Sequence, residues 1–255
     1  MNPSDEGSRT ARFQTSPVAE GGTSVEAWTS WDDGLLTLDL RRCPGLTVVA
    51  PHPDDETLGL GATMAALSAA GVDVQVVSVT DGESAYPDST PQQRKELKAL
   101  RRKEVRRSAR ILGVAEPISL DFPDGELAGL EHDIATRLAS LLGSHPAGRW
   151  CAATWRGDGH PDHETVGRAA AAAAARTGAE LVEYPVWMWH WAQPGDPAVP
   201  WSRARRISLT DRAIQAKHAA VKCFPSQTRP TSDGYTVLPP TVVARALAVG
   251  EVMFI

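Results

Sequence analysis

The sequence predicts an α/β fold: a Rossmann-like three-layer sandwich with a mostly parallel central sheet and a C-terminal extension that covers the active-site rim. Three observations support this prediction. Short apolar runs alternate with longer segments of helical spacing. Several of these helical segments end at a glycine. The 255 residues, of which 42% are hydrophobic and 22% charged, suffice for one domain of this kind with a full core.

The first 24 residues differ in composition from the rest of the chain. They are rich in Ser, Gly, Thr, Pro and charged residues and offer few apolar side chains to bury. Segments of this composition gain too little from burial to offset the entropy cost of ordering. The sequence therefore predicts a disordered tail at residues 1–24 and a folded domain at residues 25–255.

Strands and helices are expected to alternate from residue 46 onward. In chain order they are a strand at 46–50, a helix at 58–71, a strand at 72–80, a helix at 92–112, a strand at 116–120, a helix at 130–142, a strand at 150–155 and a helix that contains the alanine run 169–175. Short apolar strands between helices are typical of a parallel sheet that is covered on both faces. Ligands bind beyond the carboxyl ends of such strands, so the loops after the four strands are expected to share one rim.

The chain changes character after residue 184. The expected C-terminal extension consists of a Trp-rich stretch, a Pro-rich connection, a strand at 205–209, a helix at 211–222 and a final apolar run at 252–255. We expect this extension to cover the rim.

Charge and cysteine content exclude several classes of partner. A net charge of −5 gives no general attraction to nucleic acid or anionic lipid, so neither a nucleic acid nor a membrane is expected as a partner. Cys43, Cys151 and Cys223 are odd in number and widely spaced, which fits a reducing cytoplasm better than a disulfide framework. The N-terminus has no apolar stretch behind its charges, and the chain has no run of the ~20 apolar residues that a membrane helix needs. A cytoplasmic location is expected.

The loop at residues 51–56, Pro-His-Pro-Asp-Asp-Glu, brings one imidazole and three carboxylates together directly after a buried strand. These groups repel and desolvate one another unless a cation compensates them. One acid would suffice to cap the following helix, so the full set favours a metal site over a simple cap.

A second cluster, Gly-Asp-Gly-His-Pro-Asp-His-Glu at residues 157–164, follows the fourth strand and begins its helix. Alone it could be a surface loop with capping residues, but the two clusters together are specific. Catalytic zinc sites use three His or carboxylate ligands and leave a fourth position to water. His52, Asp55 and His163 supply that set, with Zn²⁺ as the expected ion, although Fe²⁺, manganese or cobalt also suit such ligands.

The remaining polar residues of the clusters suggest the chemistry. Metal-bound water can be acidified to a pKa near ~7, and Asp54 is suited to take its proton as the water attacks a carbonyl. The oxyanion that forms needs a positive partner besides the metal. His160 is the candidate for this positive partner, and Asp162, which is not itself a metal ligand, is expected to keep it protonated.

These residues resemble the LmbE-like or PIG-L N-acetylglucosaminyl deacetylase family, which carries a (P/A)HPDDE signature and a later HPDH, both intact here. RRKEVRRSARILG is similar to the family's Arg-x-x-Glu helix, FPDGEL to its Pro-Asp-Gly turn and KCFPSQ to its Ser-Gln segment, so the resemblance spans most of residues 46–227. It implies the same metal ligands, base and oxyanion residue that the two clusters predict, and it adds Arg101 and Asp124 as contacts to sugar hydroxyls.

The resemblance thus implies a zinc-dependent N-deacetylase that hydrolyses the N-acyl amide of an N-acetylglucosamine-type sugar conjugate, with metal-activated water as nucleophile and Asp54 as general base. Two alternatives stay open. The same residues could cleave a larger thiol or metabolite conjugate as an amidase. The chain could also be a metal-retaining sugar-binding protein without turnover, because fold alone never proves activity.

Two further patterns allow competing interpretations. Gly59 and Gly61 suggest a dinucleotide-binding turn, but Met64 stands where its third glycine belongs, so nucleotide binding is not expected. Three tryptophans alternate at positions 187, 189 and 191, and in an extended segment they would share one face. They could bind a sugar or an acyl chain, although core packing or a subunit contact is the commoner use, which leaves a homo-oligomer open.

Overall fold

The structure is a computed structural model that describes residues 3–86, 88–145, 148–232 and 234–255. Its strands are β1 (Leu36–Leu38), β2 (Leu46–Ala50), β3 (Val74–Ser78), β4 (Ile118–Ser119), β5 (Trp150–Thr154), β6 (Glu180–Tyr184), β7 (Ala204–Ile207) and β8 (Val252–Phe254). Its α-helices are α1 (Pro3–Gln14), α2 (Val25–Thr29), α3 (Asp55–Ala69), α4 (Pro91–Leu112), α5 (Glu131–Leu142), α6 (Pro161–Thr177), α7 (Met188–Trp191), α8 (Asp211–Val221), α9 (Pro225–Thr228) and α10 (Pro240–Ala248).

The described strands form one sheet in the order β1-β7-β8-β6-β5-β2-β3-β4. Neighbouring strands pair in parallel except at β8, which runs antiparallel to β6 and β7. Successive side chains of a strand point to opposite faces, and β2 shows this directly. Val48 packs in a core cluster with residues of α3, α4 and α8, whereas Val49 packs with residues of α5 and α6 on the other face.

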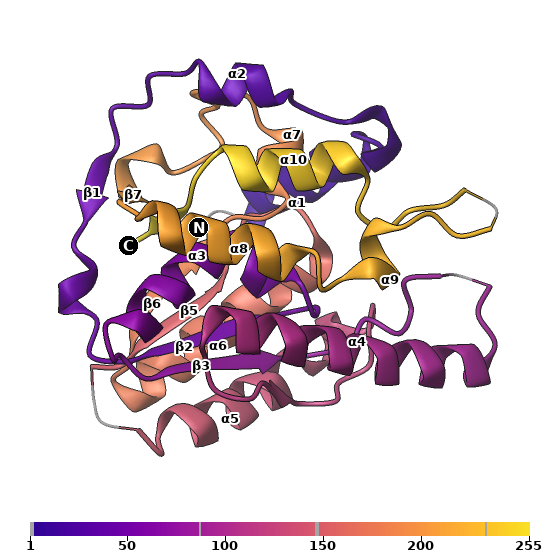
Figure 1. Cartoon of the computed structure of the whole chain (residues 1–255), viewed down its shortest axis with the longest axis horizontal. Coiled ribbons are helices and arrows are strands. Elements are labelled where there is room, and N and C mark those ends of the chain that lie inside the picture. The colour runs from indigo at the N-terminus through magenta and orange to yellow at the C-terminus, as the bar shows by residue number, and fades with distance from the viewer. Residues whose placement is uncertain (1–2, 87, 146–147, 233) are drawn as a thin grey trace.

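Helices therefore cover both faces of the sheet, and Figure 1 shows α5 below it and α8 above it in this view. The prediction of a three-layer α/β fold with a mostly parallel sheet is confirmed. The elements agree closely with those expected: α4 ends before Gly113 as predicted, and it starts at Pro91, one residue before the expected start, after a capping box of Thr90 and Gln93.

Two elements differ from the prediction. Helix α3 begins at Asp55, three residues before the expected start, because the acids of the first motif occupy its first turn, where the helix dipole favours negative charge. Strand β6 was not predicted, since its sequence, Glu-Leu-Val-Glu-Tyr, contains two glutamates. One of them, Glu183, is buried and forms ion pairs with Arg156 and Arg203. These arginines are distant in the sequence, so the local pattern could not predict the ion pairs.

Helix α3 bends at Leu60, whose backbone angles are not helical (φ −135°, ψ 18°). Just beyond the bend, the backbone N–H groups of Ala62 and Thr63 donate to the Glu251 carboxylate at 2.8 and 2.7 Å. Lys217 Nζ lies 3.0 Å from the same carboxylate, and both charged side chains are buried. Glu251 thus caps the second half of α3 from a distant part of the chain.

The glycines near this bend have a packing role. A Cβ atom at Gly59 would lie 2.3 Å from the Tyr184 ring, and one at Gly61 would lie 3.0 Å from the Lys217 side chain. The Gly-x-Gly pattern is therefore explained by the close approach of α3 to Tyr184 and Lys217, without a nucleotide.

The N-terminal segment differs from the disordered tail that was predicted for residues 1–24, because its described part contains helix α1. Arg9 is buried and its guanidinium lies 5.6 Å from the Trp155 ring centroid. Arg12 forms an ion pair with Asp196 and lies 4.6 Å from the Trp191 ring centroid. These partners come from distant parts of the sequence, so the composition of the segment alone could not indicate its order.

The three alternating tryptophans do not share a face, because residues 188–191 form the short helix α7. Trp189 and Trp191 pack in a core cluster, whereas Trp187 packs in a different cluster and lines a cavity. The three cysteines are free thiols. Among the described residues, the structure contains no helix with the length and apolar character required to cross a membrane.

Candidate metal centre

The two polar clusters meet because β2 and β5 are neighbours in the sheet. The strands pair in parallel, with Leu46 opposite Trp150 and Val49 opposite Ala153. From β2 the chain continues to β3 on one side, and from β5 it continues to β6 on the opposite side. Open α/β sheets bind ligands at such a point, between two strands whose connections run in opposite directions. The loops that follow β2 and β5 carry the first and second clusters and lie at the same edge.

Three of these side chains form a compact group of metal-ligating atoms. His52 Nδ1 and His163 Nε2 each lie 3.2 Å from Asp55 Oδ2, and one ligand atom from each residue lies within 4.8 Å of the others. His163 is fully buried, yet its Nε2 has no hydrogen-bond partner among the described residues. The contact between His163 Nε2 and Asp55 therefore lacks hydrogen-bond geometry, and a buried ring nitrogen without a hydrogen bond is unfavourable unless a ligand is present. Two imidazoles and a carboxylate fit a divalent cation such as zinc.

A second group, formed by His52, Asp124 and Asp162, also has ligand atoms within 4.8 Å of one another. It uses the other ring nitrogen of His52, whose Nε2 lies 3.1 Å from Asp124 Oδ1 and 3.3 Å from Asp162 Oδ2. The first group offers two imidazoles and one carboxylate, and the second offers one imidazole and two carboxylates, so the first is the better match to a catalytic zinc site. With an ion in the first group, Asp124 and Asp162 would contact the opposite ring nitrogen of His52, as carboxylates commonly do behind metal-bound histidines.

His163 is oriented by Asp158, a residue to which sequence reasoning gave no role. Asp158 Oδ2 lies 2.8 Å from His163 Nδ1, which leaves Nε2 on the side of Asp55. The same buried carboxylate accepts the backbone N–H groups of Val186, Trp187 and Met188, each at 2.9 Å. Asp158 thus fixes a metal-ligand candidate and the start of α7 together. The position of Asp158 inside the second cluster indicated a possible role in the site. Only the fold shows that its carboxylate is the one that contacts His163.

Substituting Asp158 with Asn is expected to weaken metal binding by roughly 10–100-fold, the usual effect of losing a carboxylate behind a metal-bound histidine. Asn keeps an acceptor for the backbone but removes the negative charge beside His163. Titration with a competing zinc chelator would measure the change. Asp121→Asn is a suitable control, since Asp121 is exposed and pairs with Lys98 and Arg102. Unchanged affinity in Asp158→Asn would contradict the assigned role.

The charges of the centre shift the pKa values of its histidines. Burial lowers the pKa of His52, but hydrogen bonds with Asp124, Asp162 and Asp55 outweigh burial and raise it well above the usual value. Burial also lowers the pKa of His163, but Asp55 and Asp158 outweigh it and raise the pKa to about 9. The carboxylates therefore create a local demand for positive charge, which a divalent cation would meet.

Asp54 stands at the start of α3 with an unusual backbone conformation, φ 150° and ψ −31°, in the region that residues other than glycine seldom occupy. Its side chain makes no capping hydrogen bond, whereas its N–H donates to Glu56 Oε2 at 3.0 Å. Burial and the neighbouring charge of Asp55 raise the pKa of Asp54 well above its usual value, although Arg101 opposes them. Strained, buried carboxylates of raised pKa are typical of functional sites.

The structure corrects the predicted state of His160. Its Nδ1 accepts the N–H of Asp162 at 3.2 Å as the cap of α6. The Asp162 carboxylate instead contacts His52 and the N–H of Gly125. Burial lowers the pKa of His160, the charges of His163 and His52 lower it further, and it falls to about 3. The prediction that Asp162 keeps His160 protonated is therefore wrong; a neutral ring with an accepting Nδ1 carries its hydrogen on Nε2.

Arg101 of α4 is buried, with 2% of its surface exposed, and its Nε and Nη2 have no hydrogen-bond partner among the described residues. A Cβ atom at Gly82 would lie 1.9 Å from Arg101 Nη1, so the absence of a side chain there makes room for the guanidinium. Asp124, the other predicted substrate contact, accepts the N–H of Ser84 at 2.8 Å. An unpaired buried guanidinium is costly unless a ligand supplies acceptors.

Most of these groups line one cavity of about 660 Å³, a size typical of small-molecule sites. Its polar side chains are His52, Asp54, Asp55, Ser84, Arg101, Asp124, His160, Asp162, Gln227 and Thr236. Its larger apolar side chains are Phe13, Val18, Val186, Trp187, Tyr235, Val237 and Leu238. His163 is the one predicted site residue that lies beneath the cavity floor, since it is fully buried and does not line the cavity.

Comparison with known proteins gives a consistent result. The PIG-L family, described as GlcNAc-PI de-N-acetylase, matches residues 47–174, about half of the chain. A diacetylchitobiose deacetylase of Thermococcus kodakarensis is 34% identical over 47% of this chain and 45% of its own length. A 1D-myo-inositol 2-acetamido-2-deoxy-alpha-D-glucopyranoside deacetylase of Mycobacterium avium is 39% identical over 32% of this chain and 29% of its own length. The chain thus matches less than half the length of these relatives.

Solved structures also include similar folds. The N,N'-diacetylchitobiose deacetylase of Pyrococcus horikoshii superposes with a TM-score of 0.59 at 24% identity, over 82% of this chain and 78% of that one. At this identity the likeness concerns the fold.

Proposed function

Because the chain belongs to the PIG-L family of GlcNAc-PI de-N-acetylases, we propose that it is a zinc-dependent deacetylase that hydrolyses the N-acyl amide of an N-acetylglucosamine-type sugar conjugate. One observation carries the proposal: His52, Asp55 and His163, whose Nε2 has no hydrogen bond among the described residues, converge at the base of a cavity that also presents Asp54 and His160. The relatives named as sugar deacetylases support the choice of substrate.

The bound ion would supply Lewis-acid polarisation of the amide carbonyl and acidify a water. The chain's own residues supply the rest. Asp54 accepts the proton of the attacking water, and its raised pKa makes it a stronger base than an ordinary carboxylate. It can then return that proton to the departing amine, so the products are a carboxylate and a free amine.

His160 acts in this proposal as a neutral hydrogen-bond donor. Its Nδ1 is fixed as an acceptor by the cap of α6, so Nε2–H is the group left to stabilise the oxyanion. Preorganised donors of this kind stabilise developing charge without reorganisation at the moment of reaction. Burial lowers the pKa of His160, and a donor that stays neutral also avoids placing a second cation beside the bound ion.

Arg101 and Asp124 line the cavity, which supports their proposed role as contacts to the sugar. Arg101 offers unsatisfied N–H donors to hydroxyl or ring oxygens, and Asp124 offers carboxylate acceptors to hydroxyl donors. A site that hydrogen-bonds a substrate in this way discriminates strongly against analogues that lack the hydroxyls.

Removing the metal is expected to abolish hydrolysis of methyl N-acetylglucosaminide, and adding Zn²⁺ is expected to restore it. Acetate release and metal content per chain, measured by mass spectrometry, would follow both steps. The ligand set predicts roughly one ion per chain. Full activity after thorough chelation would refute the metal-dependent mechanism.

Two alternatives give different outcomes in the same assay. Clear preference for bulky thiol or metabolite amides over N-acetylglucosaminides would identify an amidase. Metal and sugar binding without turnover would identify a binding protein. Asp54 lines the same cavity as His52 and Asp55, which favours turnover over binding alone.

A further inference from the structure

We propose that the substrate carries an apolar chain or ring besides its amino sugar, and that this group lies against an apolar wall of the cavity. The apolar wall is defined by Phe13, Val18, Val186, Trp187, Val237 and Leu238. The inference rests on the proposed function, because it assigns a substrate class to the same site.

The apolar wall and the reacting groups come from different parts of the chain. Every polar residue with an assigned role in the cavity lies within residues 47–174, the part that matches the family. The apolar wall lies wholly outside that range, at residues 13–18, 186–187 and 237–238. The matched part therefore supplies the chemistry, whereas the flanking segments shape the rest of the cavity and can select the substrate.

The apolar wall begins close to the reacting groups. The Phe13 ring centroid lies 5.8 Å from that of His160 and 5.2 Å from that of Trp187. Phe13, Val18, Val186 and Val237 are only partly buried, and they pack with Trp187 and Leu238 in one cluster. An apolar surface inside a cavity gains free energy when a ligand displaces its water. A sugar ring could stack a C–H face on Phe13 or Trp187, but the aliphatic side chains of Val18, Val186, Val237 and Leu238 offer its hydroxyls no hydrogen bonds.

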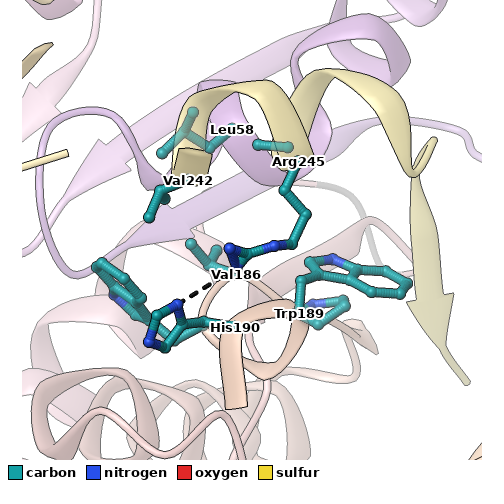
Figure 2. A pocket seen from close by; sticks show the side chains of 9 residues that line it. Leu58, Val186, Trp189, His190, Val242 and Arg245 are labelled. Carbon is teal, nitrogen blue, oxygen red and sulfur yellow. Dashed lines mark hydrogen bonds between the residues drawn. The ribbon is translucent and has the colours of Figure 1, made fainter. Parts of the chain in front are cut away.

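The N-terminal part of the apolar wall is fixed in place by a buried pair. Arg245 Nη1 lies 3.3 Å from His190 Nδ1, and Figure 2 shows this contact between α10 and α7 as a dashed line. His190 Nε2 donates to Ser16 O at 2.9 Å, and Arg245 Nη2 donates to Gly21 O. The two side chains thus hold the backbone on either side of Val18. The apolar wall is therefore preformed, which favours binding because little order must be gained.

A small cavity behind the apolar wall strengthens this conclusion. It measures about 10 Å³ and is lined by residues of α3, α7 and α10, including Leu58, Trp189 and Val242 (Figure 2). A space of this size holds at most about one water. The void adjoins the apolar wall at Val186 and Trp187 and leaves these two side chains little space to move away from the substrate cavity.

Two substrate series test the inference with the zinc-loaded enzyme. In one series the N-acyl group of a methyl glucosaminide grows from acetyl to hexanoyl and octanoyl. In the other, N-acetyl is kept and the glycoside grows from methyl to butyl and octyl. We expect kcat/KM to rise at least tenfold along one series, since each buried methylene is worth on the order of fourfold. The series that rises identifies which part of the substrate carries the apolar group.

Variants connect the gain to the apolar wall. Phe13→Ala and Val237→Ser are expected to lower the ratio of kcat/KM for the longest substrate to that for the shortest by roughly tenfold. Ile111→Ala, which truncates an exposed apolar residue of α4 away from the cavity, should leave this ratio unchanged. Circular dichroism would verify that each variant is folded.

The outcomes separate this inference from the proposed function. If N-acetylglucosaminides are hydrolysed but kcat/KM stays constant along both series, the proposed role of the apolar wall is wrong. The proposed deacetylase function is then unaffected. The proposed role is also wrong if kcat/KM rises along a series but the ratio for the longest to the shortest substrate is unchanged in both Phe13→Ala and Val237→Ser. Absence of turnover on every substrate overturns the proposed function. In that case tighter calorimetric binding of octyl than of methyl N-acetylglucosaminide would still support the apolar wall.

Discussion

Replacing Asp54 with Asn is expected to lower kcat by roughly 10²–10⁴-fold, the usual contribution of a general base, while the metal stays bound. Asn preserves the size of the side chain and tolerates unusual backbone angles better than most residues, so the φ of 150° at this position can be kept. The amide cannot take the proton of the attacking water, whereas the proposed ligands His52, Asp55 and His163 are untouched. Single-turnover kinetics and metal analysis of the same sample would measure both quantities.

Asp121→Asn provides the control for Asp54→Asn, because it removes an exposed carboxylate on the surface and should leave kcat within a factor of two or so. A variant that loses metal and activity together would show that Asp54 is a ligand. A variant that keeps more than a tenth of the wild-type kcat would contradict the role of general base.

Replacing Glu251 with Ala is expected to lower the free energy of unfolding by about 3–5 kcal/mol, the usual cost of breaking a buried ion pair from one side. The substitution leaves Lys217 buried without its partner. It also removes the acceptor for the N–H groups of Ala62 and Thr63, just beyond the bend of α3. Urea unfolding followed by far-UV circular dichroism would measure the loss.

Two companion variants separate charge from simple truncation. Glu251→Gln keeps an acceptor for the α3 amides and should lose less stability than Glu251→Ala. Glu116→Ala removes a glutamate whose side chain is 71% exposed, and it should change stability by less than about 0.5 kcal/mol. Equal losses in Glu251→Ala and Glu116→Ala would show that the buried pair contributes nothing.

Much of the candidate site could be predicted from sequence because its residues lie in two short segments at strand ends. A parallel sheet brings such ends to one edge, and β2 and β5 are in fact neighbours. The spacing of His52, Asp55 and His163 therefore sufficed to anticipate their approach, which the structure shows. Their binding of zinc remains a proposal.

The orientation of the supporting acids could not be predicted in the same way. Asp158 and Asp162 both lie in the second cluster, yet one turns to His163 and the backbone of residues 186–188, and the other turns to His52. Which way each carboxylate faces depends on the start of α6 and on the packing of α7. Local sequence contains neither constraint, so the pairing of Asp162 with His160 was wrongly assigned.

The N-terminal segment shows the limit of reasoning from composition. Its order depends on contacts between Arg9 and Trp155, between Arg12 and Asp196, and between Ser16 and His190. Each joins residues more than a hundred positions apart; two use a charged side chain of α1, and the third uses the backbone carbonyl of Ser16. A method that counts apolar residues assigns such a segment to disorder, because its stability comes from the surface that receives it.

The adjacency of β2 and β5 links ion binding to folding. The proposed ligands lie on segments separated by more than a hundred residues, so they converge only after β5 has inserted beside β2. An unfolded chain offers no preassembled site. The ion would therefore act as a clamp across the middle of the sheet, and at a thousand times its dissociation constant it would stabilise the native state by about 4 kcal/mol. Thermal stability of the protein should then follow the zinc supply of its surroundings.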